Sequence, residues 1–421
     1  MACPTPEKAK TAPSRVAALL AHRSGRKTVE PGDRIEVGVD RLLLDGPSAA
    51  AILEVVAMEG RERGRPAPKS ASRFLFIGGT EQPPDEAKKV EAFARKHHLP
   101  LSMDPQFSGF PGAVAVEEGL VESHHILVAN RSEVGSLGGI GSLVLRADPL
   151  EMIGLFQSRR LEIEVPNTVV VEVFGGLPRW ATPFDLAVAV IQEAGGVDTL
   201  KGSVLELYGD TVKGLSPAAR LSLCESFAQL GLVGMIPPDK GTEIWLRARS
   251  TDRDGGKESA APWARGFPEP SVRVDGSRTS SVAVLNAKTG RSVKVSDRPL
   301  KASDVVVHGR PEDLGLALEV IRERQIQSGI RLNWIPAERR SFLHAAERGM
   351  LADWFRAGGS VLPPGAAPPP LATGAKRVTT IISEGKDVLV GPVVAATVAI
   401  AGRAMTPEEM LREHPRVTAR R

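Results

Sequence analysis

Cysteine is nearly absent from this chain. Its 421 residues include only Cys3 and Cys224. Two thiols so far apart in the sequence provide no disulfide framework, which is typical of a reducing compartment. They also fall short of the three thiolates that hold a [4Fe-4S] cluster with one iron open to substrate. The sequence therefore predicts a protein without such a cluster, and we expect no other cofactor.

Aromatic residues, net charge and long apolar runs are also scarce. The chain has one tyrosine and a formal net charge of +4, which is small for a surface of this size. Few rings are available to stack on bases, so we expect no nucleic-acid partner. No apolar run approaches the roughly 20 residues that cross a bilayer, and the first ten residues lack the apolar core of a signal peptide. We therefore expect a cytoplasmic protein without a membrane partner.

Strand and helix patterns alternate along the chain and predict an α/β protein with mostly parallel sheets. A chain of 421 residues is too long for one hydrophobic core. The stretch Ser250–Pro270 is rich in Gly, Ser, Asp, Arg and Pro without apolar periodicity, as interdomain linkers are. We place the boundaries at an N-terminal extension over 1–27, domains over 28–165 and 166–255, a linker over 256–275 and a third domain over 276–421.

Several short segments follow one another in a specific order. They are Pro31–Asp33, Asp45–Ser48, Gly109, Val114–Leu120, Thr182–Leu186, Leu205–Gly209, Ser216–Cys224, Arg310–Leu314 and Val388–Gly402. In order and spacing they resemble the large subunit of the aconitase and 3-isopropylmalate dehydratase superfamily, over almost the whole chain from about residue 28. The resemblance implies three α/β/α domains around a central cleft, no swivel domain, and a separate small subunit as partner.

The departures from the family pattern fall on its chemistry. Gly78–Gly79 replace an Asp-His pair, Gly112 replaces a substrate-side His, and Arg131–Val134 replace Asp-Ser-His-Thr so that only Ser132 persists. The three cluster cysteines align with Val306, Ser360 and Pro363. Val and Pro offer no electron pair to iron and Gly relays no proton. The resemblance thus describes a divergent member without the cluster ligands.

Two candidate groups come from strand ends, where open parallel sheets place ligand crevices. Glu206 matches a family glutamate near the reacting centre and is a candidate acid or base, with Tyr208 beside it as a substrate contact. A buried carboxylate paired with an arginine is the alternative. Arg310 matches an arginine that faces the substrate carboxylate, and His308 lies on the same strand or turn as a catalytic candidate. An ion pair of Arg310 with a carboxylate at the following helix start is the alternative.

Two further groups are candidate anion sites. The first group lies in the turn after a predicted strand, ahead of several glycines. It consists of Asn130 and Arg131 as candidate substrate contacts and of Ser132 and Glu133 as candidate catalytic residues. Those glycines form no Walker loop, and packing explains them better. The pair Lys376–Arg377 lies near the family's third-domain arginine loop, although an exposed basic pair is the commoner case. We expect no metal site.

Two functions remain open. The first is a cluster-free lyase or isomerase that binds a small carboxylate ligand and catalyses isomerisation, hydration, dehydration or a related elimination by acid/base chemistry. The second is a non-catalytic protein that serves as a scaffold, regulator or carboxylate-binding subunit. Persisting polar residues favour the first, and the loss of ligands and proton carriers favours the second.

Overall fold

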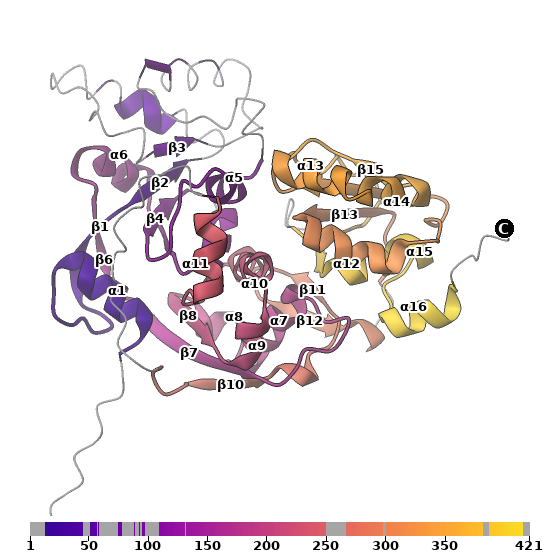
Figure 1. Cartoon of the computed structure of the whole chain (residues 1–421), viewed down its shortest axis with the longest axis horizontal. Coiled ribbons are helices and arrows are strands. Elements are labelled where there is room, and N and C mark those ends of the chain that lie inside the picture. Colours follow the sequence, from indigo (N-terminus) through magenta and orange to yellow (C-terminus); the bar gives the residue numbers. More distant parts are fainter. Residues whose placement is uncertain are drawn as a thin grey trace, which may run out of the picture.

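The computed structural model describes residues 13–44, 51–56, 75–77, 109–130, 132–249, 267–297, 300–381 and 387–415, with single residues at 58, 88, 92, 95 and 96. Their strands form four sheets. The sheets and their helices make three lobes that follow one another along the sequence (Figure 1). None of the helices in these ranges combines the length and apolarity needed to cross a bilayer.

The first lobe holds a parallel sheet in the order β3-β2-β4-β5 and a two-stranded antiparallel sheet of β1 and β6. Its helix α1 (Arg15–Ser24) begins at Ser14, whose hydroxyl accepts from the N–H of Ala17, and packs against both the first lobe and β8. The remaining elements are β1 (Arg34–Gly38), β2 (Arg41–Leu44), β3 (Leu75–Ile77), α5 (Pro111–Glu117), β4 (Ile126–Ala129), β5 (Leu143–Arg146), α6 (Pro149–Ser158) and β6 (Arg160–Glu164).

The second lobe holds a parallel sheet in the order β10-β7-β8-β9. Residues 272–275, which the sequence places in the linker, form β10 and pair with β7. The chain therefore returns to this sheet before it enters the third lobe. The elements are β7 (Asn167–Phe174), α7 (Pro183–Glu193), α8 (Val197–Leu200), β8 (Ser203–Tyr208), α9 (Asp210–Gly214), α10 (Pro217–Gln229), β9 (Val233–Met235), α11 (Lys240–Arg247), β10 (Val272–Asp275) and the 3-10 helix η3 (Gly276–Arg278).

The glycine-rich segment after β4 is the 3-10 helix η2 (Ser132–Ile140), not an open turn. It packs directly on α10 and β9. A Cβ atom on Gly135 would collide with Ala228, and one on Gly138 would collide with the carbonyl of Gly234. The glycines thus permit a close approach of the first lobe to the second, which is the packing explanation offered by the sequence.

The third lobe holds a seven-stranded sheet in the order β12-β11-β17-β16-β13-β14-β15. Only the pairs that involve β11 are antiparallel. The elements are β11 (Val282–Asn286), β12 (Arg291–Lys294), η4 (Val295–Asp297), β13 (Asp304–Gly309), α12 (Pro311–Ile321), β14 (Arg331–Pro336), α13 (Arg339–Glu347), α14 (Met350–Ala357), β15 (Ser360–Val361), β16 (Arg377–Thr379), β17 (Val388–Val390), α15 (Pro392–Ala401) and α16 (Pro407–Glu413).

A short connection links the second and third lobes. Residues 276–281 are all that separates β10 from β11. Asp185 near the start of α7 accepts from the N–H of Val282 at 3.0 Å, and it also closes the capping box with Thr182. Burial raises the pKa of the Asp185 carboxyl to about 6. The start of β11 is therefore fixed directly to a helix of the second lobe.

Candidate functional site

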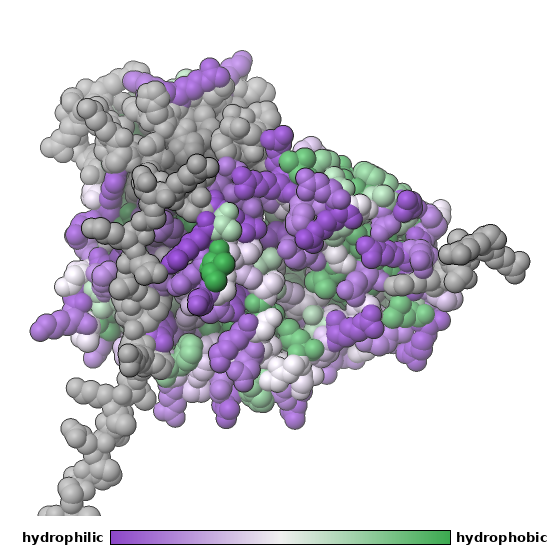
Figure 2. Space-filling view, in the orientation of Figure 1, coloured by the Kyte–Doolittle hydropathy of each residue, from purple (hydrophilic) through white to green (hydrophobic). Residues whose placement is uncertain are grey.

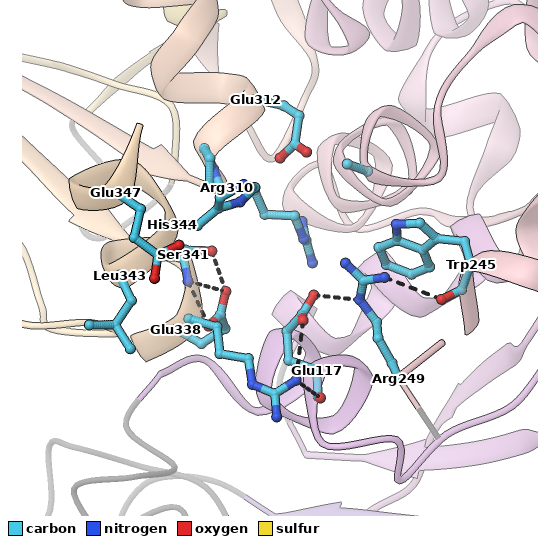
Figure 3. Close-up of a pocket in the computed structure, with 13 residues that line it drawn as sticks. Glu117, Trp245, Arg249, Arg310, Glu312, Glu338, Ser341, Leu343, His344 and Glu347 are labelled. Atoms are coloured by element: carbon cyan, nitrogen blue, oxygen red, sulfur yellow. Dashed lines mark hydrogen bonds and ion pairs between the residues drawn. The ribbon is translucent and has the colours of Figure 1, made fainter. Parts of the chain in front are cut away.

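A polar cavity of about 330 Å³ lies where the three lobes meet (Figure 3). Its volume is at the lower end of the range for small-molecule sites. Its walls come from α5, α10, α11, the start of α12, and α13. The lining residues are Glu117, Ala218, Trp245, Arg249, Arg310, Pro311, Glu312, Glu338, Arg340, Ser341, Leu343, His344 and Glu347.

A backbone bridge joins the first and third lobes next to this cavity. Gly109 pairs with Glu338 in an antiparallel bridge, and the N–H of Phe110 donates to the carbonyl of Ala337 at 2.8 Å. Gly109 has φ +154°, and a Cβ atom there would lie 2.5 Å from the Cβ of Glu338. Only glycine allows this approach. The bridge sets α5, which starts two residues later, so that Glu117 enters the cavity from its last turn.

Arg310 follows β13 and immediately precedes α12. Its N–H donates to Asp313 at 3.0 Å, so that this carboxylate caps the helix and fixes the backbone of Arg310. The residue is 5% exposed, and its side chain reaches toward the middle of the cavity (Figure 3). Its Nη1 makes no hydrogen bond to any described residue, and the nearest charge is Glu225 Oε2 at 3.8 Å. A buried guanidinium nitrogen without a hydrogen bond is costly, and a bound carboxylate would satisfy it.

The other two arginines of the cavity are already paired. Arg249 donates from Nε to Glu117 at 3.0 Å, and its guanidinium lies 3.7 Å from the ring centre of Trp245. Arg340 donates from Nη1 to the carbonyl of Glu117 at 2.8 Å and lies 4.0 Å from its Oε2. Figure 3 shows Glu117 at the centre of this group. Glu117 thus neutralises one wall of the cavity from within.

Glu338 is a carboxylate of the cavity whose surroundings change its proton affinity. It is the N-cap of α13, where both carboxylate oxygens accept from the N–H of Ser341 at 2.9 Å and Oε1 also accepts from its hydroxyl. The residue is 4% exposed, and burial raises the pKa of its carboxyl despite the hydrogen bonds from Ser341. The nearby charge of Glu117 acts in the same direction as burial. A proton on Glu338 is therefore held more tightly than on an ordinary glutamate.

His308 lies on β13 next to a second, much smaller cavity. Its Nδ1 is 3.7 Å from Glu225 Oε1, and the ring of Phe110 contacts it edge-on at 4.4 Å between centres. Burial, and then the charge of Arg310, lowers the pKa of His308 to about 3. The cavity measures about 30 Å³ and is also lined by Asp313 and Thr380. It has room for about one or two water molecules, which could reach the neutral imidazole.

Comparisons with known proteins find relatives along most of the chain. A family model described as the aconitase family (aconitate hydratase) matches residues 81–271. The chain is 25% identical to the 3-isopropylmalate dehydratase large subunit of Moorella thermoacetica, over 94% of this chain and 98% of that protein. It is 26% identical to the probable methanogen homoaconitase large subunit of Methanothermobacter thermautotrophicus, over 83% of each. The chain is thus similar to large subunits of the aconitase superfamily over most of its length. Among solved structures, that of aconitase X from Thermococcus kodakaraensis matches with a TM-score of 0.47 and 13% identity over 90% of each chain.

The cluster typical of [4Fe-4S] dehydratases in this superfamily does not fit the residues described around the cavity. Val306 is buried within β13, Ser360 begins β15, and Pro363 follows it. Cys224 is buried within α10 and lines neither cavity, and burial raises the pKa of its thiol. Nowhere in the described ranges do three His, Cys, Asp or Glu side chains gather in a way that could hold a metal ion. Soft thiolates hold such clusters, whereas this cavity offers carboxylates and arginines.

Glu206, the acid or base candidate that the sequence resemblance singled out, lies elsewhere. Its Oε2 accepts from the N–H groups of Arg15 at 2.7 Å and Val16 at 3.3 Å in the first turn of α1. The side chain is fully buried, and burial raises its pKa to about 7. Glu206 thus anchors α1 and does not line the cavity that Arg310 lines. Its hydrogen bonds go to backbone N–H groups, and the charge of the Arg15 side chain also acts on it, in line with the alternative interpretation of a buried carboxylate beside an arginine.

Two further predicted contacts also lie away from the cavity, and others are only partly described. Tyr208 stacks on Phe267 with ring centres 4.5 Å apart, and its hydroxyl donates to the carbonyl of Pro268 at 3.4 Å. Asn130 follows β4 and does not line the cavity. The backbone of Ser132 and Glu133 begins η2, whereas Arg131, Gly78 and Gly79 lie outside the described residues.

Lys376 and Arg377 occupy the opposite end of the third sheet. Arg377 is 1% exposed and donates from Nε to Asp304 at 2.6 Å and from Nη2 to the carbonyl of Pro369. Asp304 begins β13, whereas Arg310 follows the end of that strand, so the two arginines are separated by the length of the strand. Lys376 is exposed. Arg377 thus has a structural role and Lys376 lies on the surface, and neither residue lines the cavity.

The cavity also holds residues that the sequence alone did not single out. Glu338 follows β14 and precedes α13, so a strand-end carboxylate with a serine three residues later was a usable signal. Arg249 comes just before the stretch interpreted as a linker, where a basic residue attracts no notice. Glu117 and Arg340 have no local signal, because their partners are more than a hundred residues away.

Proposed function

We propose that this chain is a cluster-free enzyme of the aconitase superfamily that adds water to, or removes it from, a small carboxylated metabolite by acid/base chemistry. Its curated relatives are named as dehydratases and homoaconitase, which supports a hydratase or dehydratase. The observation that carries the proposal is the buried Nη1 of Arg310, which faces the cavity without a hydrogen bond to any described residue. The side chains around it are carboxylates and arginines, which supports acid/base chemistry without iron.

Arg310 binds the carboxylate of the substrate and fixes its orientation. A charge-assisted hydrogen bond inside a half-enclosed cavity is stronger than one in open water. Pro311 and the Asp313 cap hold the arginine backbone at the start of α12, so the guanidinium needs little reorganisation when the ligand arrives. Positioning of this kind is a large part of what an acid/base site contributes to rate.

Glu338 carries the proton. In the elimination direction its carboxylate takes a proton from the carbon next to the bound carboxylate, while the hydroxyl on the following carbon leaves as water. His344, which lines the same cavity, donates the proton that this leaving group needs. A new carbon–carbon double bond results, and hydration is the reverse. A pKa raised toward neutrality suits Glu338 to both directions.

A separate small subunit covers the mouth of the cavity. The curated relatives are named as large subunits, which supports a two-subunit enzyme. Figure 2 shows hydrophobic surface over α11 and along α13 and α14, on a face that is otherwise largely hydrophilic. Ile244 on α11 is 58% exposed, Leu343 on α13 is 42% exposed, and Phe355 on α14 is 53% exposed. Apolar side chains on two sides of a polar cavity are suited to a partner that seals it from water.

The decisive test is Arg310→Ala, compared with Arg322→Ala at the other end of the same helix. Loss of a charged hydrogen bond weakens carboxylate binding by about 10-fold to 100-fold, so Arg310→Ala should show this loss in calorimetry with 3-hydroxybutyrate or crotonate. Arg322 pairs with Asp353 at 2.8 Å on the surface and should leave binding unchanged.

Turnover should be followed by the absorbance of the conjugated double bond, in metal-free protein with its small subunit. Equal binding by Arg310→Ala and the unmodified chain would overturn the proposed site. Iron and sulfide in stoichiometric amounts in anaerobically purified protein would overturn the cluster-free route. Binding without turnover would favour the non-catalytic, carboxylate-binding alternative.

A further inference from the structure

We propose that Glu117 sets the charge selectivity of the cavity, so that the ligand it accepts carries a single carboxylate. The inference rests on the proposed function, because it concerns the same cavity, and it narrows the substrate class. The curated relatives do not suggest it. It follows from how the arginines of this chain are paired.

Arg310 is the arginine of the cavity that Glu117 does not engage, and its Nη1 lies 3.8 Å from the carboxylate of Glu225. Both Arg249 and Arg340 direct N–H groups at Glu117, through its carboxylate at 3.0 Å and its carbonyl at 2.8 Å. Arg249 also donates to the carbonyl of Trp245 at 3.2 Å and stacks on its ring. Only Arg310 keeps a buried nitrogen with no hydrogen bond to the described residues. One carboxylate satisfies that nitrogen, and a second would find its arginines occupied.

The overall charge of the lining points the same way. Four glutamates face three arginines across the cavity; these are Glu117, Glu312, Glu338 and Glu347 against Arg249, Arg310 and Arg340. A protonated Glu338 only brings this balance to zero. A ligand with two negative charges would therefore place the second beside Glu117, where like charges repel. The far end of the ligand should be neutral.

Glu117 is a carboxylate built into the protein at the place where a second ligand carboxylate would bind. Its side chain is 15% exposed and comes from α5 in the first lobe, whereas Arg340 belongs to α13 in the third. Glu117→Gln keeps the size and one acceptor oxygen but removes the charge. Arg249 then loses its charged partner, and Arg340 loses the negative charge at 4.0 Å while it keeps its bond to the backbone carbonyl. The positive charge of both becomes available to an external anion, and the cavity should accept a dicarboxylate.

The experiment compares probes of four carbons that differ in one carboxylate. 3-Hydroxybutyrate and crotonate carry one, and malate and fumarate carry two. Dissociation constants are measured by calorimetry for the unmodified chain, Glu117→Gln, Glu117→Asp and Glu118→Gln. Glu118 is the matched control, because it lies 3.8 Å from Arg340 on the next residue but does not line the cavity.

The unmodified chain should prefer the monocarboxylates by about tenfold or more. Glu117→Gln should remove or reverse that preference, whereas Glu117→Asp and Glu118→Gln should keep it. Malate bound as tightly as 3-hydroxybutyrate by the unmodified chain, or an unchanged ratio in Glu117→Gln, would overturn this inference alone. If no probe binds to the unmodified chain, the proposed function fails as well. The aspartate variant keeps the ion pair, so a selectivity change confined to the glutamine variant cannot be ascribed to misfolding.

Discussion

Replacing Glu206 by glutamine tests whether this buried carboxylate anchors α1 but lowers the free energy of unfolding once it loses its proton near neutral pH. The carboxylate accepts two backbone N–H groups of α1, at 2.7 Å from Arg15 and 3.3 Å from Val16, and its Oε1 is buried without a hydrogen bond to any described residue. A glutamine side chain at this position would retain an oxygen that can accept the same two bonds. The substitution therefore removes the ionisation and keeps the cap.

The magnitude follows from the pKa. Burial raises the pKa of Glu206 from an ordinary 4.5 to about 7, and each tenfold change in proton affinity is worth about 1.4 kcal/mol at 25 °C. Between these values the folded chain holds a proton that the unfolded chain has released, so the free energy of unfolding falls as the pH rises. The proton on Glu206 contributes about 3 kcal/mol to the free energy of unfolding. This contribution is complete below pH 4.5 and is lost as the pH rises through about 7.

The assay is urea unfolding of the unmodified chain and Glu206→Gln from about pH 4.5 to about pH 8, followed by tryptophan fluorescence. The difference between the two proteins cancels other titrating groups, and it should shift by about 3 kcal/mol in favour of the variant as the pH rises. Hydrogen exchange of the Arg15 and Val16 amides reports the same change locally. A difference that does not depend on pH, or one that favours the unmodified chain at about pH 8, would contradict this reasoning. It would show that the N-terminus of α1 stabilises the negative charge of Glu206 more than burial destabilises it.

Two further substitutions test how the lobes and the third sheet are held. Gly109→Ala places a Cβ atom 2.5 Å from the facing side chain at φ +154° and should lower the free energy of unfolding by about 1–3 kcal/mol, while Gly214→Ala, which meets nothing within 4 Å, should not. Thermal unfolding measures both, and equal midpoints would argue against the close approach. Arg331 and Arg377 both pair with buried Asp304. Arg377→Met removes the buried partner and leaves only Arg331, so it should cost up to about 3–5 kcal/mol, whereas Arg331→Met, whose side chain is 47% exposed, should cost about 1 kcal/mol or less. Similar losses in denaturant titrations would contradict that assignment.

Local features of the fold could be predicted from the sequence because their causes are local. The apolar run Ile126–Ala129 forms β4, which is buried along its whole length. Ser14, a residue type preferred at helix N-termini, caps the first helix. The apolar spacing of Pro311–Gln327 predicts one helix over that stretch, whereas α12 ends at Ile321 and Glu323 then adopts φ +59°. Apolar spacing alone gave no sign of that turn.

The partners of the candidate residues could not be predicted, because they come from distant segments. Glu206 is buried at a strand as expected, but its partners lie about 190 residues earlier. Arg377 is tied to Asp304 across 73 residues, which no local pattern reveals. The motif around Arg310 did lead to the cavity, because that arginine lies where a strand ends and a helix begins. The opposing charges of Glu117 and Arg249 depend on how three lobes meet.

The short stretch 276–281 between β10 and β11 has a consequence for ligand entry. So short a strap, with Val282 bonded to Asp185, restrains the second and third lobes against each other, and the pairing of Gly109 with Glu338 holds the first lobe to the third. We expect the described lobes to keep this arrangement when a ligand enters the cavity. Access to the cavity then depends on what covers its mouth.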